Sequence, residues 1–226
     1  MKQGYSGSTV QRKGDLVEKT SSDLTFIQSN ERQADLIALS RGLAILPDII
    51  RIAGESIAME FVEGEEGLTI DNAKRTGGAL RLLHAQGGYP HACMTGVEWL
   101  FDLTNVNLAK IGRHLLDKAM LSEYPDDALI HSEPVQFIEK KDGSIVFIDF
   151  EGIGMGSRYQ DLGFIYYIAE RDHQPEIYDR FQAGYQPGST QIEPERVRQM
   201  AGLISCAYAS FYDFELRMDL GLRLFK

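Results

Sequence analysis

The segment from residue 145 to residue 163, IVFIDFEGIGMGSRYQDLG, constrains the fold most, because it joins an apolar strand to an acid and then to a glycine-rich turn. Ile145 to Ile148 form a short apolar run behind the polar turn at residues 140–143. This pattern is typical of a buried strand that is entered through a tight turn. Asp149 therefore leaves the core at a fixed point and is a candidate functional acid.

A second apolar segment with a polar end precedes this strand in the chain. Residues 128–133 read ALIHSE, so an imidazole and an acid follow three apolar residues. Two acids at the ends of paired strands can hold a metal ion or share acid–base chemistry. Asp149 and Glu133 are the pair that the sequence places in this way.

Composition limits the classes of protein that fit this chain. With 226 residues, 43% of them hydrophobic, the chain can bury a core as one large domain or two small lobes. Its net charge of −10 disfavours a nucleic acid or an anionic membrane as partner. No run of about 18 apolar residues occurs, so we expect no membrane insertion and a cytoplasmic location. The oligomeric state is left open.

The cysteines and histidines do not indicate a metal centre. Cys93 and Cys206 lie far apart with no CxxC pair, which supports neither a disulfide framework nor a zinc site. The histidines outside the ALIHSE segment follow no metal-ligand spacing. We therefore expect them to be structural or exposed; they are His84, His91, His114 and His173.

The first part of the chain predicts strands and one helix. Residues 4–19 alternate as in a hairpin with a turn at residues 12–15. A helix is expected from Ser29 or Asn30 to Gly42, with Asn30 as its cap. Residues 56–62 alternate again like a strand.

Residues 63–67 are polar and rich in glycine, unlike the apolar segments before them, and we place a hinge there. Helical patterns dominate beyond it, at residues 70–84, 97–121, from 161 onward and 194–222. We therefore predict an α+β protein with an N-terminal lobe at residues 1–62 and a mainly helical lobe at residues 63–226. The order of features along the chain is that of a protein-kinase-like phosphotransferase. A strand hairpin with a lysine comes first, and a helix glutamate, a hinge and an acid at the end of a late strand follow it.

The segment IDFEGIGMGSRYQDLG resembles the IDFG-type motif and the DRYQDLA-type segment of the aminoglycoside phosphotransferase and choline kinase family. The resemblance extends over almost the whole chain. It implies a bilobal protein-kinase-like fold, in which a small antiparallel sheet with one helix precedes a larger helical lobe. It also implies that Asp149 binds the magnesium ion of a nucleotide and that Asp161 braces the active-site loop.

The N-terminal lobe resembles the nucleotide-binding half of that family. Residues 4–8, GYSGS, resemble the loop that covers the phosphates, and Lys19 resembles the lysine that contacts them. Glu31 is implied as the ion-pair partner of Lys19, and residues 59–64 resemble the hinge that binds adenine through Glu60 C=O and Val62 N–H. The residues expected to bind the nucleotide are therefore Gly4, Ser6, Gly7, Ser8, Lys19, Glu31, Glu60 and Val62.

The catalytic loop is similar to the family's but altered. The family shows HGD, four residues and then Asn, whereas residues 131–137 read HSEPVQF. By this alignment Glu133 takes the place of the catalytic aspartate, and Gln136 is the nearest equivalent of the metal-binding asparagine. His131 is expected to support the loop. Glu133 and Gln136 are each one methylene longer than the family residues, which is expected to slow transfer where in-line geometry matters.

The resemblance implies a magnesium- and ATP-dependent enzyme that moves the γ-phosphate to a hydroxyl of a small molecule of the aminoglycoside, choline, sugar or amino alcohol type. Glu133, Asp149 and Lys19 are the implied catalytic residues, and Asp149 and Gln136 the implied metal ligands. The alternative is a degenerate kinase-like module that binds a nucleotide without transferring phosphate, as the HSE loop suggests. A protein or polysaccharide-sugar kinase is a further possibility, although no APE-like element follows Asp149 to support a protein acceptor.

Other readings of the motifs are less consistent with their context. The glycines at residues 152–156 follow a strand, but a dinucleotide-binding fingerprint needs a βαβ unit and an acid about 20 residues later. Asp149 and Glu151 would moreover repel a pyrophosphate. A serine hydrolase is weaker still as an interpretation, because the chain contains no G-x-S-x-G elbow.

Overall fold

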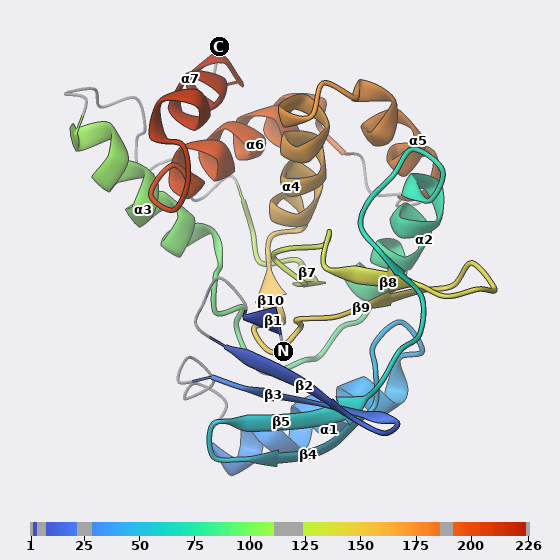
Figure 1. Ribbon diagram of the computed structural model, residues 1–226. Coiled ribbons are helices and arrows are strands. Elements are labelled where there is room, and N and C mark those ends of the chain that lie inside the picture. The colour runs from blue at the N-terminus through green and yellow to red at the C-terminus, as the bar shows by residue number, and fades with distance from the viewer. Residues whose placement is uncertain (1, 4–7, 22–28, 111–123, 186–191, 225–226) are drawn as a thin grey trace. The chain divides into compact units, whose positions relative to one another are not determined.

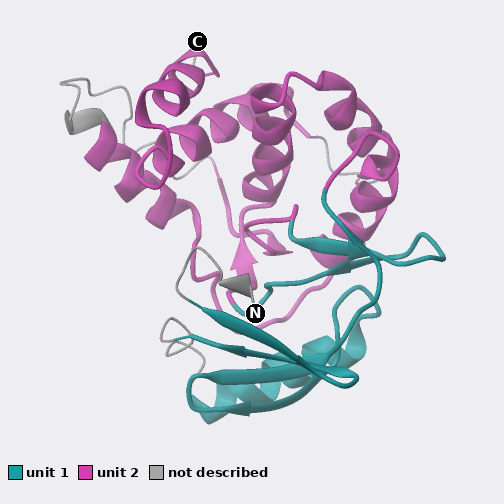
Figure 2. Cartoon of the chain, in the orientation of Figure 1, with its two compact units in different colours: residues 1–67, 136–151 teal, residues 68–135, 152–226 magenta. Residues whose placement is uncertain are grey.

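The computed structural model describes residues 2–3, 8–21, 29–110, 124–185 and 192–224 (Figure 1). The chain forms two compact units, shown in two colours in Figure 2. Unit 1 comprises residues 1–67 and 136–151, and unit 2 comprises residues 68–135 and 152–226. Antiparallel sheets build unit 1 and helices dominate unit 2, so the predicted α+β class is confirmed. The sequence-based boundary after Val62 did not anticipate that residues 136–151 return to unit 1.

Unit 1 contains a five-stranded antiparallel sheet with the order β1-β2-β3-β5-β4. Its strands are β1 Lys2–Gln3, β2 Thr9–Lys13, β3 Leu16–Thr20, β4 Ile49–Ala53 and β5 Ser56–Glu60. The predicted hairpin corresponds to β2 and β3, and Gly14 adopts φ 65° in its turn, a conformation that glycine reaches without strain. Lys19 lies on β3 between Val10 of β2 and Ile57 of β5.

Helix α1, Asn30–Gly42, is the single helix of unit 1 within the described residues. Its cap is Ser29 rather than Asn30, because Ser29 is still extended and its hydroxyl accepts a hydrogen bond of 3.2 Å from Arg32 N. The helix is fixed to the sheet through Ser40, whose hydroxyl accepts a hydrogen bond of 3.0 Å from Ile49 N of β4. Leu36 on the same face is fully buried.

A small antiparallel sheet completes unit 1 and positions Asp149. It consists of β6 Glu65–Glu66, β8 Phe137–Glu139 and β9 Ile145–Phe147. All residues of β9 are buried, which confirms the predicted buried strand. Ile148 N donates a hydrogen bond of 2.9 Å to Gln136 O, so the chain is still held to its neighbour one residue before Asp149.

Unit 2 is built from helices and one short strand pair. The helices are α2 Ala73–His84, α3 Val97–Lys110, α4 Arg158–Arg171, α5 Pro175–Tyr185, α6 Pro194–Tyr208 and α7 Phe214–Leu224, and the strands are β7 Ala128–Ile130 and β10 Gly154–Gly156. The helical stretch expected at residues 194–222 is therefore two helices, with a break after Tyr208. No helix in the described ranges is both long and apolar enough to cross a membrane.

The glycine-rich segment after Asp149 is a strand in part, not only a turn. Residues 154–156 form β10, which pairs antiparallel with β7. A Cβ on Gly154 would lie 2.4 Å from the carbonyl oxygen of Ala92, far inside van der Waals contact. Close backbone packing therefore explains this glycine, in agreement with the rejection of a dinucleotide-binding motif.

Helices α2 and α5 pack closely through glycines, which gives a stability prediction. A Cβ on Gly184 of α5 would lie 1.8 Å from the carbonyl oxygen of Lys74 on α2. We expect Gly184→Ala to lower the free energy of unfolding by about 1–3 kcal/mol through this overlap, as measured by urea denaturation. Gly78→Ala is the control, because its nearest atom is 3.9 Å away, and it should instead stabilise by about 0.4–1 kcal/mol. Equal effects of the two substitutions would contradict the packing.

Candidate functional site

A cavity of about 430 Å³ lies in unit 1 and brings together half of the residues predicted to bind the nucleotide and both predicted metal ligands. The predicted residues that line it are Ser8, Lys19, Glu60, Val62, Gln136 and Asp149. Gly4, Ser6 and Gly7 lie outside the described residues, so their predicted role stays a prediction. A volume in this range is typical of small-molecule sites.

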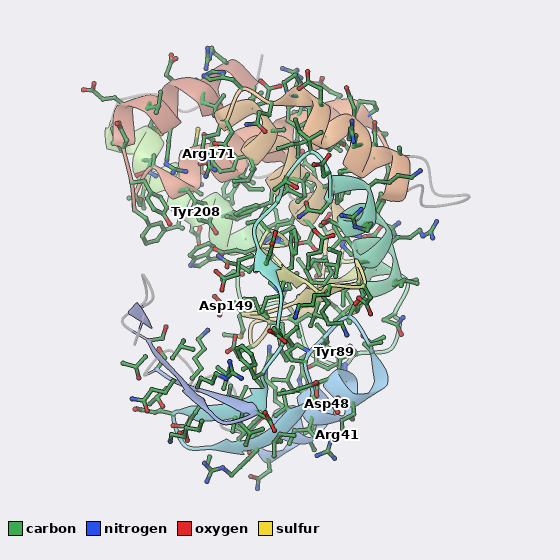
Figure 3. The ribbon with its side chains drawn as sticks, turned by 45° about the vertical axis from the view of Figure 1, so that its right-hand side comes forward. Arg41, Asp48, Tyr89, Asp149, Arg171 and Tyr208 are labelled. Carbon is green, nitrogen blue, oxygen red and sulfur yellow. The ribbon has the colours of Figure 1, made fainter. Side chains whose placement is uncertain are left out.

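Lys19 and Asp149 form an ion pair at the wall of this cavity. Lys19 Nζ donates to Asp149 Oδ1 and lies 3.2 and 3.3 Å from the two carboxylate oxygens of Glu151. The side chain of Lys19 is largely buried, whereas that of Asp149 is 46% exposed and open to a ligand (Figure 3). Asp149 adopts φ 60°, which is uncommon for a residue other than glycine and is frequent at functional sites.

The charges of this group influence each other strongly. Burial opposes the charge of Lys19, but the carboxylates of Glu151 and Asp149 outweigh it, so the pKa of Lys19 is raised. Burial raises the pKa of Glu151 to about 7, against the opposing effect of Lys19. Lys19 is therefore a stable cation within reach of the cavity, and Glu151 is its buried partner.

Glu31 does not take part in this ion pair. It lies exposed in the first turn of α1, and among the described residues the carboxylate partners of Lys19 are Asp149 and Glu151. Glu151 was not predicted as a partner of Lys19, because the sequence indicated it only as an acid that precedes the glycines at residues 152–156. The available signal was the spacing of Asp149 and Glu151, two residues apart directly after a buried strand.

The raised pKa of Glu151 predicts a pH dependence of stability. A carboxyl group whose pKa rises from 4.5 to about 7 on folding contributes stability that is full below pH 4.5 and is lost as the pH rises through about 7. We expect Glu151→Gln to remove up to about 3 kcal/mol of this pH dependence. Urea denaturation of both proteins across this range measures it, and parallel stability curves for the two proteins would contradict the assignment.

The remaining lining of the cavity is suited to a flat apolar ring. Its apolar members include residues from the strands of both sheets and the residue after β9, among them Val10, Val17, Met59, Ile138 and Ile148. Phe61 N donates a hydrogen bond of 2.8 Å to Asp15 O. Glu60 N donates a hydrogen bond of 2.9 Å to Asp48 O, so neighbouring backbone groups at the end of β5 have different partners. This is consistent with the predicted hinge contacts, which remain a prediction.

The oxygen atoms around Asp149 fit a magnesium ion that shares its coordination with phosphates. Gln136 and Asp149 line the same cavity and offer the hard oxygen ligands that Mg²⁺ prefers. Glu151 Oε1 is buried and lies 3.2 Å from Lys19 Nζ, so the charge of this oxygen is already paired. These residues contain no cluster of three or more His, Cys, Asp or Glu side chains arranged for a metal. A site with one or two carboxylates is nonetheless usual for Mg²⁺ that is bound together with a nucleotide.

In unit 2, Asp161 holds the loop that carries Glu133. The fully buried carboxylate of Asp161 accepts hydrogen bonds from His131 N at 2.9 Å and Ser132 N at 2.7 Å. These contacts fit the bracing role that the resemblance implied. His84 Nε2 lies 2.9 Å from the same carboxylate, and its Nδ1 lies 2.6 Å from the hydroxyl of Tyr185. The buried His84 thus has a structural role, as expected.

Glu133 itself has a partner that the sequence did not indicate. Its Oε1 accepts a hydrogen bond from the hydroxyl of Tyr208 at the end of α6. Glu133 N lies 3.3 Å from His131 Nδ1, and Ser132 between them adopts φ 75°. The loop is thus fixed through both its backbone and the side chain of Glu133.

Comparisons with known proteins identify the fold. Neither a family model nor a curated protein matches the chain. Among solved structures, the choline kinase LicA from Streptococcus pneumoniae is 14% identical to this chain, with a TM-score of 0.63. The match covers 96% of this chain and 86% of the LicA chain. A choline/ethanolamine kinase family protein from Mesorhizobium loti is 16% identical with a TM-score of 0.60, covering 96% and 74%.

A spectinomycin phosphotransferase solved with ADP and spectinomycin is also similar, with 14% identity and a TM-score of 0.57 over 96% of this chain and 84% of that one. At these identities the likeness shows the fold. The chain therefore has the fold of choline kinase and aminoglycoside phosphotransferase structures, which confirms the fold that the resemblance implied.

Proposed function

We propose that this chain, which has the fold of small-molecule kinases, is an ATP-dependent phosphotransferase that transfers the γ-phosphate to a hydroxyl of a small molecule. The observation that carries this proposal is the ion pair of the buried Lys19 with the half-exposed Asp149 in the cavity of unit 1. A cation for phosphates and an acid for their metal ion are the two charges that phosphoryl transfer requires.

Unit 1 supplies the nucleotide-binding residues in this proposal. Lys19, oriented by Glu151, binds the α and β phosphates after Asp149 releases it. Glu60 and Val62 bind adenine through their backbone, and Ser8 belongs to the loop over the phosphates. Asp149 and Gln136 hold Mg²⁺, which when bound neutralises charge on the phosphates.

Unit 2 supplies the residue that acts on the acceptor. Glu133 accepts the proton of the attacking hydroxyl, which a carboxylate can do as a general base. The bond between the hydroxyl oxygen and the γ-phosphorus forms while the bond from the γ-phosphorus to the leaving oxygen of ADP breaks. His131 and Asp161 keep the loop in place, so that Glu133 is presented from a rigid backbone.

A nucleotide-binding module without transferase activity is the second candidate. The observation that favours it is that the place of the catalytic aspartate is taken by Glu133, one of whose oxygens is already bonded to Tyr208. Such a module would keep Lys19 and Asp149 for binding and would not turn ATP over.

The two candidates are separated by measuring binding and turnover on the same protein. Isothermal titration with ATP, in Mg²⁺ and in EDTA, measures binding; ADP release in the presence of choline, ethanolamine, aminoglycosides, macrolides and sugars measures transfer. The proposal expects magnesium-dependent binding and turnover with at least one acceptor. Binding without turnover on the whole panel favours the module, and absence of ATP binding contradicts both candidates.

A further inference from the structure

The contact between Tyr208 and Glu133 joins two distant parts of unit 2. Tyr208 is the last residue of α6, and Glu133 lies in the loop after β7. The hydroxyl donates to Glu133 Oε1, and a hydrogen bond from a neutral hydroxyl to a carboxylate is stronger than one between neutral groups. Within the described part of unit 2, the side-chain hydrogen bond of Glu133 is made by Oε1. One oxygen of the carboxylate is thus fixed while the other stays available.

Tyr208 is itself held rigidly by aromatic neighbours. Its ring packs edge-to-face on Phe164 of α4 at 5.7 Å and on Phe211 at 6.2 Å, and it stacks nearly parallel to Tyr212 at 6.3 Å. Burial, reinforced by Glu133, raises the pKa of Tyr208, so its hydroxyl stays protonated and can donate. A donor placed on a packed helix is a precise support for a neighbouring group.

The length of the Glu133 side chain makes such a support necessary. A glutamate has one more rotatable bond than an aspartate, so its carboxylate samples more positions when nothing holds it. The backbone of the loop is fixed by Asp161 and His131, but these contacts do not restrain the end of the side chain. The hydroxyl of Tyr208 supplies that restraint.

We propose that Tyr208 is a positioning residue for Glu133: it holds one carboxylate oxygen so that the other faces the acceptor hydroxyl. This inference rests on the proposed function, because it gives Glu133 the role of general base. It also explains how a glutamate can act as the base where the related family has an aspartate: the length of the Glu133 side chain fits the position of the Tyr208 hydroxyl. Glu133→Asp, which shortens the side chain, should therefore lose the contact and activity together.

The kinetic test uses Tyr208→Phe, which removes the hydroxyl and keeps the ring. We expect kcat to fall by about 10- to 100-fold, the usual effect of removing a supporting hydrogen bond from a reacting group, with KM for ATP unchanged. Turnover is measured with the acceptor found in the panel, or with water as acceptor when none is found. Tyr166→Phe on α4 is the control and should leave kcat unchanged, because burial and the neighbouring charge of Glu170 also raise the pKa of this tyrosine, which lies away from Glu133 in the sequence.

Combining substitutions shows whether Tyr208 acts through Glu133. Adding Tyr208→Phe to Glu133→Asp should cause no further loss, because the shorter side chain has already lost the contact. Adding it to Glu133→Gln should also cause none, because an amide is no general base and leaves nothing to position. A loss of the same size in these backgrounds as in the wild type would overturn the proposal. So would an unchanged kcat in Tyr208→Phe when the wild type is active.

A spectroscopic measurement tests the contact without turnover. In protein labelled with ¹³C at the ζ carbon of tyrosine, the Tyr208 signal is assigned by its loss in Tyr208→Phe, and it should shift in Glu133→Gln while the Tyr166 signal does not. An unshifted Tyr208 signal overturns the proposal. If the signal shifts but the wild type turns over neither an acceptor nor water, the proposed function fails and the role of Tyr208 in transfer fails with it, whereas the contact itself stands.

Discussion

Asp149→Asn is expected to lower kcat for phosphoryl transfer by about 10³-fold, because it removes the charged ligand of the magnesium ion. Asparagine has nearly the same shape and tolerates the positive φ of this position better than alanine does. Lys19 keeps Glu151 as a partner, so the variant should fold. Turnover and Mg²⁺-dependent ATP binding measure the effect, and both should fall.

Asp48→Asn is the matched control for this experiment. Asp48 is an exposed acid of the same unit that does not line the cavity, and Figure 3 labels it apart from Asp149. Its substitution should change neither kcat nor ATP binding. If Asp149→Asn retained the turnover of the control variant, the assignment of Asp149 as the metal ligand would be wrong.

The second large effect is expected for Asp161→Asn, this time on stability. The Asp161 carboxylate accepts hydrogen bonds from two backbone groups of the loop and lies within hydrogen-bond distance of His84, in a fully buried position. An amide has one oxygen and two donor hydrogens, so at least one buried donor loses its acceptor. We expect the free energy of unfolding to fall by about 3–5 kcal/mol in urea denaturation.

Asp172→Asn provides the control on the same helix. Asp172 follows the end of α4 and forms an exposed ion pair with Arg171, labelled in Figure 3. Exposed pairs contribute about 0–1 kcal/mol, so this substitution should change stability little. Similar losses for Asp161→Asn and Asp172→Asn would show that Asp161 does not brace the loop.

The sequence predicted the parts of the site that depend on local patterns. The apolar run at residues 145–148 identified a buried strand, and Asp149 follows it as expected. The hairpin predicted Lys19 on a strand, and the register of β3 places it beside the cavity. These predictions succeeded because alternation and turn residues determine the strand directly.

The partners of these residues depend on tertiary contacts, which one sequence does not contain. The family resemblance implied Glu31 as the ion-pair partner of Lys19, but among the described residues Lys19 pairs with Asp149 and the buried Glu151. Tyr208 lies in a helical pattern, where an aromatic residue usually packs in the core. Its contact with Glu133 spans 75 residues, so no local pattern could indicate it.

The return of residues 136–151 to unit 1 affects how the protein can be made. Lys19 lies 130 residues before Asp149 and 132 before Glu151, and both acids belong to the returning segment. During synthesis, the sheet of residues 1–67 therefore emerges from the ribosome long before the carboxylates that neutralise its buried lysine. The same segment supplies two strands of the second sheet. An independently expressed unit 1 must accordingly carry residues 136–151, joined to residue 67 by a linker.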